Sequence, residues 1–531
     1  MTTHILTDRP TASTRTLPAA LTGGLAGLVA ALAMTLVMLA LRLLFGISPP
    51  PEMIPDRLAP TMSIEQFFAL IGWFGGYNEL KQFGIGSFLV GQLVVGTLLG
   101  VLYARLTGPG TGSAAADGVR RRLTFPVAIV AVAWVASLAL LWPVLGTSFR
   151  GLPPGTARIV TALGLLAAYG TFGAVLVVAY RALRARSEHV DSEVGPTSVG
   201  RRALLVGGVG LALAALSGAA LRRLYDLATF AYDGTRFMGP LTPITPNDLF
   251  YVVTKNVVDP SVERGLWRLE IGGLVDRPRT YRFDELAALP ATTQQTTLMC
   301  ISNGVGDGLM SNAEWTGVPL RSLLDQAGPR AGVVEVWLHG VDGYTDTFPL
   351  EKALDPTTLV VYEMNGQPLA ENHGYPVRVI VPGMYGEKNV KWVTRIELVD
   401  RDVKGFYERQ GWGPDFVVPT RSRFYEPDLS QPIQAGSTVA LRGIVFGGDR
   451  GVSRAEVSVD DGQTWQQAEL EYPGTRLSWA IWRYAWRPAQ PGDYRLAVRG
   501  VDGAGAPQPA EDLGIVPTGA RGYHRVVARV V

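Results

Sequence analysis

The chain has 531 residues, which is too many for one ordinary hydrophobic core, so several domains are expected. Its formal net charge of +2 is too close to neutral for a nucleic-acid-binding protein. Hydrophobic residues make up 47% of the sequence. They are concentrated in the first ~220 residues, where apolar runs long enough to cross a bilayer recur.

Five apolar segments in this first part predict membrane-spanning helices, because about 20 apolar residues cross the ~30 Å of hydrocarbon. The segments are 21–46, 85–106, 123–145, 158–183 and 203–221. Only the first carries a charge well inside, Arg42, and this residue lies near the end, where a long side chain reaches the interface. We therefore predict a membrane domain over 1–222, followed by a linker at 223–239.

Arginines predict the orientation of these helices. The second and fourth connections between spans contain Arg105, Arg120, Arg121, Arg122, Arg181, Arg184, Arg186, Arg201 and Arg202. The positive-inside rule places these two connections in the cytoplasm. An odd number of spans then places everything after Leu221 outside it. The sequence predicts a multi-pass cell-membrane protein with an extracytoplasmic C-terminal half.

The pair Arg201-Arg202 stands directly before the last apolar run. Such a pair resembles a twin-arginine export signal, which serves proteins that are exported folded and loaded with cofactor. Two ordinary positive-inside arginines before an anchor helix are an equally good interpretation. The two interpretations are compatible.

The histidines argue against redox chemistry within the membrane domain. They are His4, His189, His339, His373 and His524, and none lies in a predicted span. Bis-histidine haem between the helices is therefore not expected. One cysteine also cannot hold an iron–sulfur cluster. We expect the membrane domain to anchor the protein and to dock partners.

The second half of the chain alternates short strands with short helices. "LWRLEIGGLV" and "VRVIVPG" predict strands, whereas "RFDELAALP" and "PLRSLLDQAG" predict short helices closed by Pro or Gly. Since regular βαβ alternation is missing from the pattern, an α+β domain is expected over 240–428. Period-2 strands and an Asp461-Gly462 hairpin turn then predict an antiparallel β-sandwich over 429–531.

Cys300 is the only cysteine, and it lies between an apolar strand and a loop of Gly, Asn and Asp. Taken alone, it can be a buried packing residue, a nucleophile or a metal ligand. A hydrolase nucleophile is disfavoured because the local sequence offers no base to activate it.

Several motifs around this cysteine resemble the sulfite oxidase family of molybdopterin-dependent oxidoreductases. The most specific is "NGQPLAENHGYPVRVIVPGMYGEKNVKWVTRIEL", and "TTLMCISNGVGDG", "FYVVTKNVVDP", "WRLEIGGLVDRP" and "RDVKGFYERQGW" resemble further family segments in the family's order. The last ~100 residues resemble its immunoglobulin-like dimerisation domain. The resemblance covers 240–531. It implies a sulfite-oxidase-type molybdopterin domain and an immunoglobulin-like β-sandwich. It also allows for a homodimer.

The resemblance also assigns site residues. It makes Cys300 the thiolate ligand of molybdenum, a soft ligand suited to that metal. The residues it places at the cofactor are Asn256, Asp342, His373, Arg378, Gly386, Glu387, Lys388 and Lys391, with Asn303 orienting the cysteine loop. Asn256 matches a family position near the metal, and Lys255 stands where sulfite oxidases have an arginine; with Cys300 these two are the expected catalytic residues. Trp315 either lines the pocket or packs in the core.

The implied chemistry is two-electron oxygen-atom transfer on a small-molecule substrate, with electrons exchanged through an unidentified partner, a quinone or a cytochrome. Sulfite is not the expected substrate. Gly304, Val305 and Asp307 stand near a family arginine position, Val403 replaces the family tyrosine, and Lys255 cannot grip two oxygens as a guanidinium does. The alternatives are a sulfite oxidase or dehydrogenase, and a non-enzymatic, membrane-anchored β-rich binding module.

Overall fold

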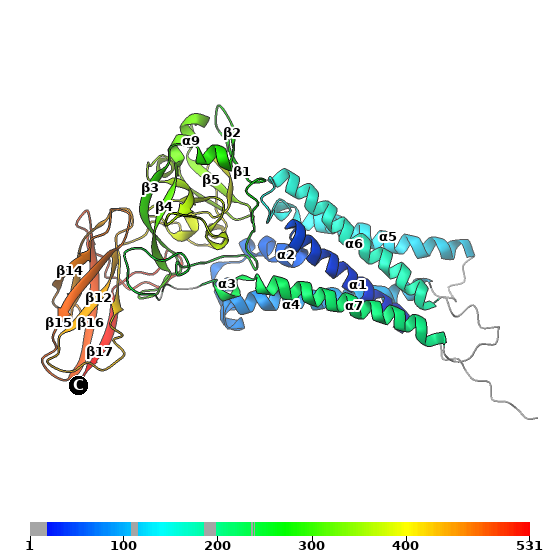
Figure 1. The fold of residues 1–531 in the computed structure, drawn as a ribbon, viewed down its shortest axis with the longest axis horizontal. Coiled ribbons are helices and arrows are strands. Elements are labelled where there is room, and N and C mark those ends of the chain that lie inside the picture. Colours follow the sequence, from blue (N-terminus) through cyan, green and yellow to red (C-terminus); the bar gives the residue numbers. More distant parts are fainter. Residues whose placement is uncertain (1–18, 108–114, 185–197, 235–236, 238) are drawn as a thin grey trace, which may run out of the picture. The chain divides into compact units, whose positions relative to one another are not determined.

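The computed structural model describes residues 19–107, 115–184, 198–234, 237 and 239–531 (Figure 1). The chain forms two compact units. The helical unit comprises Met1–Leu44, Phe83–Trp142 and Thr161–Asp226, and the sheet unit comprises Phe45–Gln82, Pro143–Val160 and Leu227–Val531. The predicted membrane domain, 1–222, thus contributes two connections, 45–82 and 143–160, to the sheet unit.

Five long helices carry the apolar segments of the first part. They are α1 (Ala19–Phe45), α4 (Tyr77–Thr107), α5 (Ala115–Leu141, continued by η2, Trp142–Val144), α6 (Pro154–Arg184) and α7 (Ser198–Asp226). All five are long and apolar enough to cross a membrane. The predicted helices at these positions are confirmed. Arg186 and the side chains of Arg120, Arg121, Arg122, Arg201 and Arg202 lie outside the described part of the chain.

Glycines let α1 and α4 pack closely within the helical unit. A Cβ atom on Gly27 would lie 2.2 Å from the Gly96 carbonyl oxygen, and one on Gly100 would lie 2.2 Å from the Gly23 carbonyl oxygen. Only residues without a side chain fit there, and small residues are typical of close contacts between membrane helices.

The sheet unit contains two five-stranded sheets. The first has the order β2 (Arg279–Arg282), β1 (Arg268–Gly273), β10 (Val393–Val399), β5 (Glu335–Gly340), β6 (Thr345–Pro349), and only β1 and β10 are parallel. The second has the order β3 (Thr292–Met299), β4 (Met310–Pro319), β7 (Leu359–Met364), β8 (Gln367–Pro368), with β9 (Arg378–Ile380) also on β7. Short helices connect them: α8 (Phe283–Ala287), α9 (Leu320–Ala327) and α10 (Leu350–Ala353).

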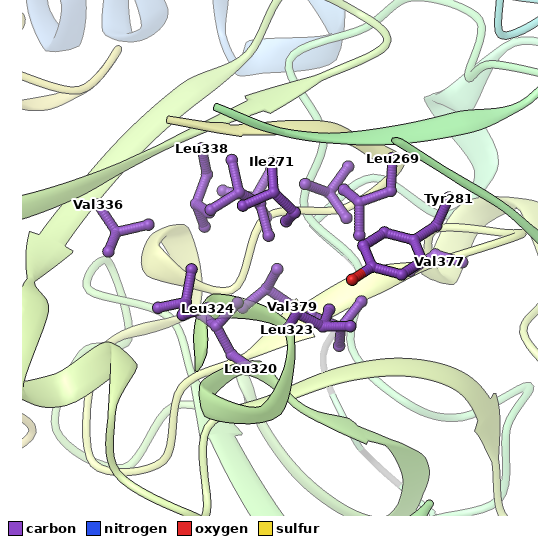
Figure 2. Packing of buried hydrophobic residues seen from close by; sticks show 14 of the residues in the cluster. Leu269, Ile271, Tyr281, Leu320, Leu323, Leu324, Val336, Leu338, Val377 and Val379 are labelled. Atoms are coloured by element: carbon purple, nitrogen blue, oxygen red, sulfur yellow. The ribbon is translucent and has the colours of Figure 1, made fainter. Parts of the chain in front are cut away.

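Helix α9 buries one face against the first sheet (Figure 2). Leu320, Leu323 and Leu324 recur at the i, i+3, i+4 spacing of a helix face and are fully buried. They point towards Leu269 of β1 and Leu338 of β5. This core fixes the strands whose ends and loops carry the site.

The C-terminal part forms one seven-stranded antiparallel sheet. Its order is β11 (Arg421–Glu426), β12 (Val439–Phe446), β15 (Ala480–Trp486), β14 (Gln466–Tyr472), β13 (Val452–Ser458), β16 (Gly492–Asp502), β17 (His524–Val530). Because β11 also contacts β16 and β17, the sheet curls into a nearly closed barrel. The predicted antiparallel strands are confirmed. The immunoglobulin-like arrangement stays a prediction.

Both connections of the sheet unit are folded against the rest of that unit. Residues 45–82 contain α2 (Pro50–Leu58), η1 (Ala59–Thr61) and α3 (Ile64–Phe74). A capping box of Ser63 and Gln66 starts α3, and Gly75 ends it at φ 84°. In the other connection, the Ser148 amide donates to the Val341 carbonyl oxygen at 3.0 Å.

Candidate active site

A cavity of about 440 Å³ lies within the sheet unit. Most of its lining comes from four stretches of chain: 233–255, the end of β3 with the following loop, 372–392, and the connection 45–82. Asp342, Tyr344, Tyr407 and Trp412 complete it. The predicted site residues among its lining are Lys255, Cys300, Asp342, His373, Arg378, Gly386, Glu387 and Lys391. Predicted site residues up to 136 positions apart in the sequence, Lys255 and Lys391, thus meet at one cavity.

Cys300 directly follows β3 and is held by backbone hydrogen bonds. Its amide donates to the Leu309 carbonyl oxygen at 3.0 Å, and its own carbonyl oxygen accepts from the Asn303 amide at 3.0 Å. The Asn303 side-chain oxygen accepts from the Leu309 amide at 2.8 Å, which closes the loop. Burial and the nearby Glu387 carboxyl raise the pKa of the Cys300 thiol to about 11. A metal that binds here must therefore displace the thiol proton.

Arg378 is a buried cation with a free donor. Its two terminal nitrogens donate to the carbonyl oxygens of His373 (3.1 Å) and Asn389 (3.0 Å). Within the described part of the chain, its Nε has no hydrogen-bond partner. Burial lowers its pKa to about 10, which still leaves it charged at neutral pH. A buried donor without a partner is costly, so this atom is suited to an anionic ligand.

Two further basic residues stand beside Arg378. The Lys391 ammonium donates to the Asn372 carbonyl oxygen at 3.0 Å. His373 donates from Nε2 to the Asn247 carbonyl oxygen at 2.8 Å. Burial lowers the pKa of His373 to about 4, so this side chain is neutral at pH 7.

Gly386 and Glu387 bring the backbone close to Cys300. A Cβ atom on Gly386 would lie 2.6 Å from the Tyr251 hydroxyl oxygen and 3.6 Å from the Cys300 Cα. Burial, and then the Asp346 charge, raise the pKa of Glu387 to about 8. Only glycine permits this approach at position 386.

Two of the predicted lysines are paired with carboxylates. Lys388 lies 2.6 Å from Asp346, and these side chains are 3% and 2% exposed. Lys255 lies 2.8 Å from Asp56. Burial alone would lower the pKa of both lysines. The attraction of the carboxylates around them outweighs burial, so the net pKa of each lysine is raised. Lys388 does not line the cavity.

Three further predicted residues do not line the cavity: Asn256, Asn303 and Trp315. The Asn256 amide donates to the Asp342 carboxylate at 3.0 Å. Trp315 is fully buried and packs on the Phe250 ring, which is a core position.

Arginines from β11 hold the cysteine loop from its other side. Arg421 donates to the Gly304 carbonyl oxygen at 2.9 Å, and Arg423 donates to the Asp307 carbonyl oxygen at 2.6 Å. Neither lines the cavity.

The sequence analysis missed a group of lining residues in the connection 45–82. They are Phe67, Phe68, Ile71, Tyr77, Asn78 and Glu79. The capping box before "IEQFFALIGWF" was a signal for a folded helix, but not for its position. Tyr344 and Tyr407 were missed as well. Tyr407 lies four residues after Val403, whose backbone instead bonds to Glu335 and Thr347.

Comparisons with known proteins identify two domains in the sheet unit. The oxidoreductase molybdopterin-binding domain matches residues 256–407, and the Mo-co oxidoreductase dimerisation domain matches 416–530. Mitochondrial sulfite oxidase of Rattus norvegicus is 32% identical over 340 residues, covering 54% of this chain and 62% of that protein. NADH nitrate reductase of Volvox carteri is 31% identical over 281 residues, covering 43% of this chain and 32% of that protein.

A solved structure, the sulfane dehydrogenase SoxCD of Paracoccus pantotrophus, shares the fold. Its TM-score is 0.50 at 24% identity, and the match covers 56% of this chain and 85% of that chain. The chain thus belongs to the sulfite oxidase family of molybdopterin-dependent oxidoreductases. The cofactor of this family domain is molybdenum–molybdopterin.

The cavity fits that cofactor. It offers a thiol as a soft metal ligand, a buried guanidinium nitrogen without a partner for a phosphate or pterin oxygen, and a backbone without a side chain at Gly386.

Proposed function

We propose that this chain is a membrane-anchored, extracytoplasmic oxidoreductase that transfers an oxygen atom to or from a small substrate other than sulfite. The observation that carries the proposal is the contrast within the site: Cys300 lines the cavity and Arg378 Nε has no partner in the described part of the chain, whereas Lys255 is paired with Asp56. When bound, the cofactor supplies two-electron oxygen-atom transfer, with water as source or sink of the oxygen.

The side chains take separate roles in this proposal. Cys300 provides the thiolate ligand. Arg378 and Lys391 hold the anionic part of the cofactor. The neutral His373 ring contacts the cofactor through hydrogen bonding. The remaining predicted residues position these groups: Asn303 through the cysteine loop, Asn256 through Asp342, and Lys388 through Asp346.

Sulfite is disfavoured because its double charge requires cations that this site does not leave free. The loop after Cys300 carries Gly304, Val305 and Asp307. Arg421 donates to the Gly304 carbonyl oxygen, and Arg423 donates to the Asp307 carbonyl oxygen from one nitrogen only; neither arginine lines the cavity. Losing one buried charge-assisted hydrogen bond costs about 1.5–3 kcal/mol.

Packing within the sheet unit supports the extracytoplasmic orientation. The connections 45–82 and 143–160 follow the first and third apolar helices, and both bond to residues after 227. They therefore lie on the same side as that domain. The other two connections carry the arginines, as the positive-inside rule requires. Reporters fused after Arg122 and Arg184 should be cytoplasmic, and one after Tyr232 should be exported; a cytoplasmic signal after Tyr232 would contradict the orientation.

A homodimer is supported by the match to the dimerisation domain. Electrons would pass to or from a cytochrome or a quinone. Light scattering of the purified protein in detergent tests the dimer.

Sulfite oxidation is the second candidate, because curated relatives over the matched region are sulfite oxidases. Purified protein separates the candidates. We expect about one molybdenum per chain, slow sulfite oxidation and faster turnover of an uncharged oxo compound. Protein free of molybdenum after cofactor-competent expression would instead favour a binding module.

A further inference from the structure

We propose that the connection 45–82 is a wall of the substrate chamber, and that it selects an uncharged substrate whose oxygen-bearing atom carries an alkyl or aryl group. This inference rests on the proposed oxygen-atom transfer. It names the substrate class and assigns its selection to residues outside both matched family segments, 256–407 and 416–530.

Helix α3 of the wall is apolar where it meets the cavity, whereas Asn78 and Glu79 of α4 add polar groups to the lining. Phe67, Phe68 and Ile71 of α3 line the cavity, followed by Tyr77 at the start of α4. Residues four apart on a helix lie on the same face, so Phe67 and Ile71 form a continuous apolar strip. The Phe68 ring meets the Trp412 ring edge-on, with centroids 6.0 Å apart, and Trp412 also lines the cavity. An alkyl or aryl substituent gains free energy by being buried among such side chains.

Buried ion pairs fasten the wall on both sides of α3. Before the helix, Asp56 pairs with Lys255 at 2.8 Å. After it, Lys81 pairs with Asp233 at 2.5 Å, with side chains 6% and 1% exposed. Lys81 also donates to the Thr254 carbonyl oxygen at 2.9 Å. These contacts make the connection an integral part of the chamber.

A further hydrogen bond holds the middle of the connection. The Gln410 side-chain amide donates to the Ala59 carbonyl oxygen at 3.0 Å. The wall is thus bonded to segments on both sides of the cavity, before and after the cysteine loop.

The charges of the chamber oppose an oxyanion. Glu79 and Asp342 contribute carboxylates to its lining; Asp233 also lines it but is paired with Lys81, and Glu387, whose pKa is raised to about 8, is mostly protonated at neutral pH. The lining cations are Lys255, Arg378 and Lys391. Asp56 neutralises the first, and the cofactor's anionic groups require the other two. An anionic substrate would have to enter without a free cation, whereas an uncharged one meets no such penalty.

The role of the wall in substrate selection is tested by measuring how an unreactive analogue binds to the molybdenum-loaded full-length protein. Methyl phenyl sulfone is uncharged and carries an aryl group. By isothermal titration calorimetry, Phe68→Ala should weaken its binding about tenfold, because an apolar contact worth about 1.4 kcal/mol is lost. Binding of dimethyl sulfone should change by less than about twofold.

Trp73→Ala is the matched control, because Trp73 lies on the same helix but is 82% exposed and does not line the cavity. Unchanged aryl sulfone binding in Phe68→Ala, or equal weakening in Trp73→Ala, would overturn the wall. Turnover tests the proposed reaction separately. Two equivalents of reduced viologen supply one electron each, and sulfoxide plus two electrons and two protons gives sulfide and water. Failure of all such turnover with intact, Phe68-dependent sulfone binding would reject the reaction and leave the wall supported.

The charge argument is tested with sulfate, an unreactive oxyanion. Asp56→Asn removes the partner of Lys255 and should tighten sulfate binding about tenfold, since an ammonium becomes available. Asp276→Asn is the control, because it breaks an exposed pair with Arg330. Sulfate binding that responds equally to both changes, or to neither, would contradict the assignment of selectivity to the Asp56–Lys255 pair.

Discussion

The cavity is built from two regions that treat their cations in opposite ways. In the segment 372–392, the two cations that line the cavity, Arg378 and Lys391, form no ion pair within the described part of the chain, whereas Lys388, which does not line it, is paired with Asp346. At the boundary with the connection 45–82, Lys255 and Lys81 are each paired with a carboxylate. The first region is suited to holding an anionic cofactor. In the second region, the charged side chains form ion pairs that stabilise the connection, and apolar side chains face the chamber. The charge partner, rather than the residue type, decides what a basic side chain does.

The largest expected effect is on the first region. Cys300→Ser replaces the thiolate ligand by a hydroxyl, which binds molybdenum far more weakly. We expect activity below about one thousandth of wild type. Molybdenum content should fall while pterin fluorescence partly persists, because Arg378 and Lys391 remain. Ser430→Ala, at an exposed serine that does not line the cavity, is the control. A fully active Cys300→Ser protein would refute the ligand assignment.

Breaking a buried pair should cost stability. Lys388→Met leaves the Asp346 carboxylate buried without its cation, which typically costs about 3–5 kcal/mol. Thermal unfolding in detergent should show a clear drop in Tm. The double variant Lys388→Met/Asp346→Asn should recover part of it, because the unpaired charge is then removed. A single variant as stable as wild type would mean that this pair is not important for the fold.

Acid should destabilise the cofactor-free protein through His373. Its folded pKa of about 4 lies below the ordinary value of about 6.5. The unfolded chain therefore binds a proton first, and stability falls as pH drops from about 6.5 towards 4, by about 3 kcal/mol in total. His373→Gln should flatten this part of the pH profile. An unchanged slope would place the acid sensitivity elsewhere.

Arg378→Ala should have a smaller effect, confined to cofactor loading. It removes one charge-assisted contact worth about 1.5–3 kcal/mol, or one to two decades in affinity. The pterin content and the molybdenum content of the purified protein should fall together, unlike in the Cys300→Ser variant. Arg330→Ala, which breaks an exposed pair, is the control and should leave both unchanged. Full loading of Arg378→Ala would contradict the proposed role of the free Nε.

Local patterns predicted one of these two regions and not the other. The five apolar helices and the antiparallel C-terminal strands follow from periodicity within short segments, whereas the grouping of Cys300 with 372–392 follows from the resemblance of their motifs to a known family. The wall does not, because Asp56 and Lys255 are 199 residues apart and each is unremarkable in its own segment. The Lys388–Asp346 pair could not be predicted either, because the sequence around a lysine does not show which carboxylate it will contact. Long-range pairing of charges is a property of the fold.

The most direct test of the account is the ratio of kcat/KM for methyl phenyl sulfoxide reduction to kcat/KM for sulfite oxidation, measured on molybdenum-loaded protein with artificial electron carriers. Two or three missing cation contacts and an apolar wall should make this ratio exceed about 100. Sulfite oxidation with kcat/KM near 10⁶ M⁻¹s⁻¹, about the middle of the usual enzyme range, would contradict it.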